Sequence, residues 1–128
     1  MLDPSGVYVL KNGYTPSTQA VLTINVAKSK PTHDPDPRPH GSDGQLVNST
    51  LDQVVINGVF NDTTGKIDFT YAVSALPVLT KHYRGFAMWD DQNQVRMMAG
   101  TFTQYEIIES NDTLHLQFAE HGWSATKQ

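Results

Sequence analysis

Apolar and polar residues alternate with a period of two along most of this chain. In residues 66–73, the side chains of Ile67, Phe69, Tyr71 and Val73 share one face, and the segment is rich in β-forming residues. Segments of similar character cover residues 6–11, 20–27, 51–60, 79–89, 95–108, 114–118 and 122–127. No segment keeps a helical period for three turns. The pattern therefore predicts an all-β chain of eight strands.

Turn-forming residues separate the predicted strands. They cluster at positions 12–17, 61–65, 90–93, 110–112 and 120–122. Asn57 and Gly58 fall inside a predicted strand, and a hairpin turn there would leave only two residues before the next turn, so we interpret Gly58 as a bulge or a barrel bend. Short connections make neighbouring strands antiparallel, and closing the sheet removes its unpaired edges. We predict one domain, residues 1–128, folded as an eight-stranded antiparallel up-and-down β-barrel.

One connection has a different composition. Residues 29–44 contain four prolines, two histidines (His33 and His40) and several aspartates. Proline removes a backbone donor, so this segment cannot form a central strand, and we predict an exposed loop or a flap across a barrel mouth. The imidazoles and carboxylates have the chemistry of metal ligands, but their spacing matches no standard site. We therefore predict a solvated polar loop that binds no metal.

Charge and composition narrow the range of partners. The chain has 128 residues, no cysteine, a formal net charge of −4 and nine scattered Lys and Arg residues. It therefore has no disulfide and no thiolate site, and it lacks the basic stripe of a nucleic-acid binder. No apolar run approaches the roughly 20 residues of a membrane-spanning helix, and the first four residues do not form a signal peptide. We predict a soluble protein, cytoplasmic or secreted with its signal removed, that needs no cofactor.

The polar residues with the clearest chemical potential lie in the predicted strand at 79–89. His82 and Arg84 share a face with Phe86 and Met88, and the opposite face carries Tyr83, Gly85, Ala87 and Trp89. If the first face lines a lumen, His82 and Arg84 would hold a polar or anionic group of a ligand. If that face is outside, they are ordinary surface charges. Periodicity alone does not decide between the two faces.

Both faces of the predicted strand at 95–108 carry apolar groups. Only one face can point into a barrel, so the surplus would lie outside, where a second subunit would cover it. Closed twofold dimers are the commonest soluble oligomers. We predict a homo-oligomer, most simply a dimer, with Met97 or Met98 in the contact. The alternative is simple packing by adaptable methionine side chains.

Several short segments have a recognisable order. Arg84-Gly85-Phe86 precedes a turn at residues 91–95, Thr101-Phe102-Thr103 follows, and Trp123-Ser124-Ala125-Thr126-Lys127 lies near the end. Together with the opening Ser5-Gly6-Val7-Tyr8, these segments resemble the avidin and streptavidin family and, more loosely, the lipocalin-like (calycin) barrels. The resemblance implies a barrel with a lumen near Tyr71, Phe102 and Trp123. The chain departs from the family pattern where Tyr8 and Phe102 stand in place of tryptophans.

These observations favour a binding protein that holds a small, mostly apolar ligand in a barrel lumen. The predicted ligand-binding residues are the aromatic Tyr71, Phe102 and Trp123 and the polar His82, Arg84 and Gln104. The alternative is a cofactor-free barrel enzyme, such as a cyclase or isomerase acting on an enclosed hydrophobic substrate. Its candidate catalytic residues are His82, Arg84, Tyr71 and Tyr105. A third possibility is an interaction protein whose core is completely filled.

Overall fold

The computed structural model of the chain describes residues 2–13, 15–27, 43–75 and 78–128. Within these ranges every regular element is a strand, and all pairings between strands are antiparallel. The strands are β1 (Gly6–Asn12), β2 (Thr15–Ile24), β3 (Asp43–Gln45), β4 (Thr50–Leu51), β5 (Val54–Val55), β6 (Asn57–Asn61), β7 (Lys66–Ala75), β8 (Val78–Trp89), β9 (Val95–Ser110) and β10 (Thr113–Lys127). The all-β, antiparallel character predicted from the sequence is confirmed.

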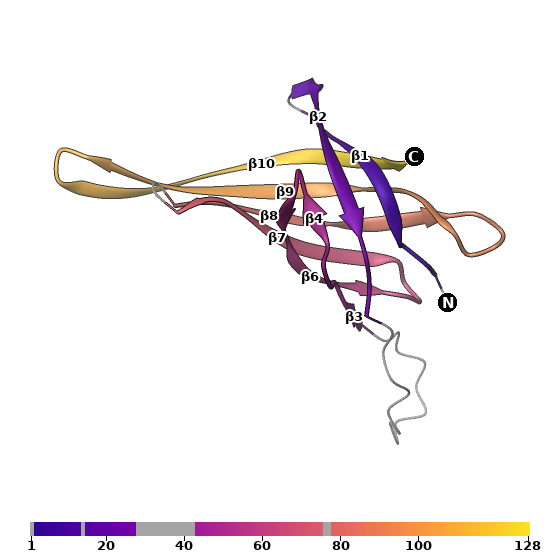
Figure 1. Ribbon diagram of the computed structural model, residues 1–128. Coiled ribbons are helices and arrows are strands. Elements are labelled where there is room, and N and C mark those ends of the chain that lie inside the picture. Colours follow the sequence, from indigo (N-terminus) through magenta and orange to yellow (C-terminus); the bar gives the residue numbers. More distant parts are fainter. Residues whose placement is uncertain (1, 14, 28–42, 76–77) are drawn as a thin grey trace.

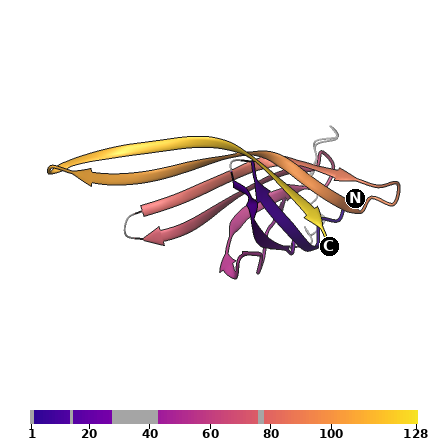
Figure 2. The ribbon, with the colours of Figure 1, turned by 90° about the horizontal axis from the view of Figure 1, so that it is seen from above.

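All ten strands belong to one sheet, in the order β3-β6-β7-β8-β9-β10-β1-β2-β4-β5. The sheet curls into a half-barrel, and β1 and β2 fold back across it (Figures 1 and 2). The segment around β3 forms backbone hydrogen bonds on two sides. Leu46 N–H donates to the carbonyl of Gly58 in β6, and Val47 N–H donates to the carbonyl of Asn25, which follows β2. The two ends of the sheet therefore approach each other closely.

One face of the sheet, here called the inner face, carries the hydrophobic core. Its fully buried side chains are Tyr8, Leu10, Leu22, Ile24, Ile56, Phe60, Ile67, Phe69, Tyr83, Val95, Met98 and Phe102. Because side chains alternate along a strand, Met98 points inward and its neighbour Met97 lies on the opposite, outer face. Of the two methionines expected in a subunit contact, Met98 is therefore a core residue.

Two strands continue far beyond the rest of the sheet (Figures 1 and 2). The pairing of β8 with β9 ends where Leu79 opposes Glu106, and β1 opposes β10 only from Trp123 onward. Beyond these limits, β9 and β10 are paired only with each other in the part of the chain described. Asn111 and Asp112, with φ of 51° and 60°, form the two-residue turn between them. We call residues 105–118 the arm; at its base, Tyr105 and Glu106 still pair with β8.

The predicted strand at 51–60 is divided into three short strands. Asp52 and Gln53 have φ of 48° and 70° and form a tight turn between β4 and β5. Gly58 lies within β6, whose register with β7 is unbroken, so no bulge forms there. A Cβ atom at Gly58 would lie 2.0 Å from the carbonyl oxygen of Asp68. Glycine is therefore needed for the close approach of the two strands, not for a bulge.

The turn predicted at residues 120–122 is wrong, because β10 runs without interruption from Thr113 to Lys127. Glu120 opposes Thr103 and Gly122 opposes Thr101 in β9, so backbone pairing outweighs the local turn preference of Glu-His-Gly. The two last predicted strands are one. Most of the predicted proline-rich loop, with its histidines, lies outside the described residues, and its end at 43–44 belongs to β3.

Candidate functional site

The structure distributes the candidate residues over both faces of the sheet. Paired positions share a face, and Tyr71 opposes Lys81, which opposes Gln104, on the face that carries the core. The inner face holds Tyr71, Phe102, Gln104 and Trp123; the outer face holds His82, Arg84 and Tyr105. The sequence-predicted site therefore separates into an inner, mostly aromatic group and an outer, mostly polar group.

The Trp123 ring lies close to Gly85 of β8, and Trp123 opposes Gly100 of β9. Its indole N–H donates to the carbonyl oxygens of Arg84 (3.1 Å) and Thr101 (3.0 Å). A Cβ at Gly85 would lie 3.0 Å from the Trp123 ring, and a Cβ at Gly100 would lie 1.9 Å from the carbonyl oxygen of Arg84. Gly85 thus makes room for the indole, Gly100 permits the close approach of β8 and β9, and the two hydrogen bonds satisfy the buried indole donor.

An aromatic stack crosses the inner face beside Trp123. The rings of Phe69 and Tyr83 are stacked with centroids 4.8 Å apart, and Tyr83 stacks on Phe102 at 5.0 Å. Trp123 meets Tyr83 edge-on at 5.6 Å. Burial raises the pKa of Tyr83, with smaller contributions from the charges of Tyr71 and Asp52, so the phenol stays neutral within this stack.

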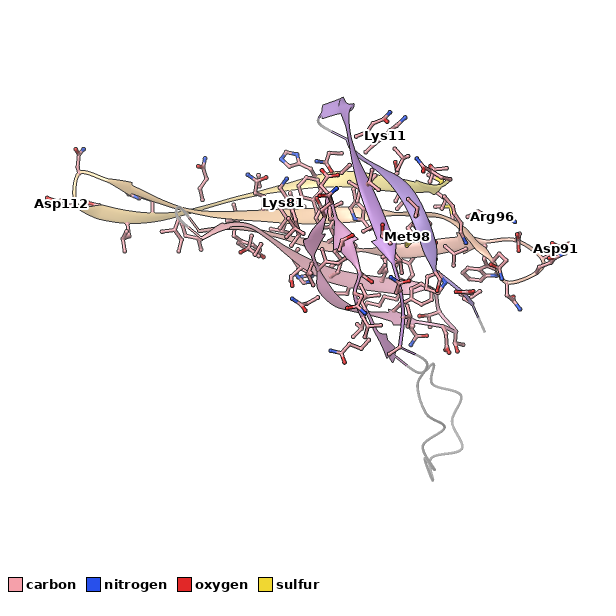
Figure 3. The ribbon with its side chains drawn as sticks, viewed as in Figure 1. Lys11, Lys81, Asp91, Arg96, Met98 and Asp112 are labelled. Atoms are coloured by element: carbon pink, nitrogen blue, oxygen red, sulfur yellow. The ribbon has the colours of Figure 1, made fainter. Side chains whose placement is uncertain are left out.

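Partly buried polar side chains surround the arm end of the stack, and we call Tyr71, Lys81, Gln104 and His121 the polar rim. The Lys81 ammonium lies 5.7 Å from the Phe102 ring centroid, and the His121 ring lies 5.4 Å from it. Burial lowers the pKa of Lys81. Lys81 lies where the arm leaves the body of the sheet (Figure 3). Among the side chains that the structure describes, no carboxylate forms an ion pair with Lys81.

Asn12 adds an unsatisfied acceptor next to this group. It opposes Trp123 in the pairing of β1 with β10. Its side-chain oxygen Oδ1 is buried and has no hydrogen-bond partner among the described residues. Buried polar atoms of folded proteins almost always have a partner. Among the described side chains, the inner face therefore has an acceptor without a partner beside the aromatic stack, and a cation, Lys81, with no carboxylate paired to it.

The outer polar group is a chain of three side chains. His82 Nε2 lies 2.5 Å from Asp68 Oδ1, and the guanidinium of Arg84 lies 3.2 Å from His82 Nδ1. Because a guanidinium can only donate, Nδ1 accepts from Arg84 and the ring proton sits on Nε2, which donates to Asp68. This cluster points away from the aromatic stack. Of the four candidate catalytic residues, only Tyr71 shares the inner face with the stack.

Sequence reasoning missed Tyr83, Lys81, His121 and Asn12 as members of the inner site. The signal that would have found the first two is the run Tyr83-Gly85-Ala87, because small residues alternating with an aromatic ring mark a crowded face. If that face points inward, Lys81 must also lie on it, because it precedes Tyr83 by two residues in the same strand. His121 was not placed on a strand face because residues 120–122 were predicted to form a turn. Asn12 was assigned to a turn, although it is the last residue of β1.

No protein-family model matches the chain, and no curated protein matches its sequence. A functional proposal therefore rests on the geometry of the molecule itself. No group of three or more His, Asp or Glu residues in the described ranges is arranged to hold a metal ion. A search of the same ranges finds no helix with the length and apolar character needed to cross a membrane.

Proposed function

We propose that this protein binds a small, largely apolar molecule carrying an anionic group at the arm end of its inner face. The observation that carries the proposal is the partly buried ammonium of Lys81, which lies over Phe102 with no carboxylate partner among the described residues. A desolvated cation without a counter-charge is costly, and an anionic ligand group would supply that charge.

The neighbouring residues complete the requirements of such a site. Ligand sites are mostly apolar with a few oriented polar groups, and here the partly buried Tyr71, beside the Tyr83–Phe102 stack, would contact the apolar body of the ligand. Gln104 and His121 would hydrogen-bond to its polar group. His82 and Arg84, predicted as orienting groups, lie on the outer face and have no part in this proposal.

The proposal is simplest if the sheet closes completely. Ala27 N–H donates to the carbonyl of Gln45, and Val47 N–H donates to that of Asn25, so backbone bonds link the end of β2 to β3. These bonds support a closed barrel of β1, β2, β3, β6, β7, β8, β9 and β10, with β4 and β5 as an appended hairpin. The inner face would then be a lumen, as the resemblance to avidin-like barrels implies, and the polar rim would line one mouth.

The two tryptophans allow a direct test. Trp123 lies in the proposed site, and Trp89 is an exposed residue near the opposite end of β8. We expect naphthoate, an aromatic carboxylate, to shift the indole N–H signal of Trp123 and the side-chain amide signal of Gln104 in two-dimensional NMR spectra. The Trp89 signal should not move.

A matched pair of lysine variants sharpens this test. Lys81→Met should weaken naphthoate binding about tenfold, as expected for loss of a charge-assisted contact. Lys11→Met should leave the affinity unchanged, because Lys11 is exposed on the outer face of β1 (Figure 3). Equal losses in both variants, or no shift of the Trp123 signal across a set of aromatic carboxylates, would refute the proposal.

A further inference from the structure

The arm has one strongly apolar face. Leu114, Leu116 and Phe118 are 72%, 66% and 68% exposed, and they alternate along β10 on the outer face. Leu116 opposes Ile107 and Phe118 opposes Tyr105, both also exposed. The opposite face of β10 in this stretch carries His115, Gln117 and Ala119. The arm therefore displays a continuous apolar strip on a single side.

Nothing within the described chain supports the arm. An isolated two-stranded hairpin is marginally stable at best in water and needs a further layer or strand on its apolar side. Contiguous exposed apolar surface of this kind marks an interaction site in a soluble protein. The arm therefore has an apolar face that the described residues leave uncovered.

The outer face of the body continues the arm and carries charges of opposite sign on its two flanking strands. Arg84 lies on β8 and Glu120 lies on β10, with β9 between them. Glu120 opposes Thr103, which opposes His82, so Glu120 stands two residues along the strands from the level of Arg84. At the far end Met88 and Met97 oppose each other.

We infer that a second copy of this chain packs against the outer face, arm against arm, about a twofold axis parallel to β9. An axis in this direction places β10 of each copy over β8 of the other, so that Glu120 lies close to Arg84 of its partner. In the arm it brings Tyr105 and Ile107 of the two β9 strands face to face, with Leu114, Leu116 and Phe118 of each copy beside them. It also places Met97 near its own symmetry mate. An axis across the strands would instead place β8 on β8 and β10 on β10, with like charges facing. The charge pattern therefore selects the first arrangement.

The size of the face suits a dimer. From Met97 to Glu109 the outer face of β9 extends about 41 Å, at about 3.4 Å per residue, and three strands span about 14 Å including side chains. The flat projection is therefore on the order of 500 Å², and its corrugated accessible surface is larger, close to the roughly 800 Å² per partner of a standard interface. Sheets packed in this way cross at about 30° and lie about 10 Å apart.

Sedimentation equilibrium tests this inference. The wild-type chain, of 14.2 kDa, should sediment at twice that mass at micromolar concentration. Leu116→Lys places a charge in the apolar strip and should raise the dimer dissociation constant at least tenfold. His115→Lys is the matched control, because it puts the same charge on the other face of the same strand and should leave the dimer intact. A monomeric wild type, or a dimer that survives Leu116→Lys, overturns the inference.

Charge reversal tests the orientation of the two copies separately. Glu120→Arg and Arg84→Glu should each weaken the dimer, and the double variant should recover most of the affinity, because the facing charges are then exchanged. The alternative axis predicts no recovery, so a double variant as weak as the single ones overturns the proposed arrangement. Binding of naphthoate at the inner face should remain unchanged in all of these variants, which keeps this test independent of the proposed ligand site.

Discussion

The same two strands form both the best-packed and the least-packed parts of this molecule. Within the body, β9 contributes Met98 and Phe102 to a core where both are almost completely buried. Three residues further on, at Tyr105, β9 enters the arm, and its described side chains become exposed. The alternation of side chains is the same in the two regions. Burial is therefore decided by what faces the strand, since strands lie over the inner face of the body and no described residue covers the arm.

This difference has a large energetic consequence. Burying one Leu or Phe side chain contributes roughly 1.5–3 kcal/mol to stability. In the body this contribution is gained when the chain folds, whereas Leu114, Leu116 and Phe118 do not gain it in the single chain. A contact with a second copy, as inferred above, would let the arm gain it.

The largest contrast should appear when one aromatic ring is removed from each region. Phe102→Ala should lower the free energy of unfolding by about 3–5 kcal/mol, because it leaves a cavity next to Tyr83. Phe118→Ala should lower it by less than about 1 kcal/mol, because only cross-strand contacts are lost. Urea unfolding in a Leu116→Lys background, which removes the contribution of the dimer, checks both values. Similar losses would mean that the arm is packed in solution even in the single chain.

A second contrast compares two glycines of adjacent strands. Gly100→Ala should cost about 1–3 kcal/mol or more, because its Cβ would lie 1.9 Å from the carbonyl oxygen of Arg84. Gly122→Ala should change stability by no more than about 0.5 kcal/mol, because its nearest neighbour would be 3.8 Å away. Thermal and urea unfolding of the two variants should separate them clearly. If Gly100→Ala does not lower stability, then β8 and β9 do not pack tightly against each other at this position.

The buried tyrosines of the body should make the protein sensitive to alkali. Burial raises the pKa of both Tyr8 and Tyr83, whereas in the unfolded chain each phenol loses its proton near pH 10. The unfolded state then binds fewer protons, so stability should fall above about pH 10, by about 1.4 kcal/mol per pH unit for each tyrosine. Tyr83→Phe should halve the slope in urea titrations above about pH 10. If the slope is unchanged in this variant, titrating groups other than Tyr83 cause the loss of stability at high pH.

The smallest expected effect concerns the tip of the arm. Asp112 has a φ of 60°, and glycine is the preferred residue at this position of a two-residue hairpin turn. Asp112→Gly should stabilise the arm by about half a kcal/mol, which slows hydrogen exchange of its amides about twofold. Amides of the body should exchange at their wild-type rates. A change in global unfolding would show that the arm and the body unfold together.

The sequence identified the strands well because their alternation is a local property. The Asn111–Asp112 turn was also predictable, since both residue types tolerate positive φ. Assignment of the faces was not, because His82–Met88 and Tyr83–Ala87 are both plausible inner sets. The inner face is identified by the close approach of Gly85 to Gly100 and of Gly85 to the Trp123 ring. These contacts join strands that are far apart in the sequence.

The candidate site was predictable only in part, for the same reason. Phe102, Trp123, Tyr71 and Gln104 share the inner face, because aromatic residues on alternating positions favour a common core; their role in ligand binding stays a prediction. His82, Arg84 and Tyr105 do not join them, since a shift of one residue in parity changes the face. The length of β10 was also beyond local reasoning, because pairing with β9 keeps Glu120, His121 and Gly122 extended.

The order of the strands has a consequence for how the chain folds. Tyr8 opposes Lys127, so the pairing of β1 with β10 joins residues near opposite ends of the sequence. Contacts of such large sequence separation are slow to form, because a long loop must be closed before they are gained. The arm is the opposite case, since a hairpin around a two-residue turn forms within about 1–10 μs. We therefore expect the hairpin of β9 and β10 to be the first structure to appear, and the seam between β1 and β10 the last.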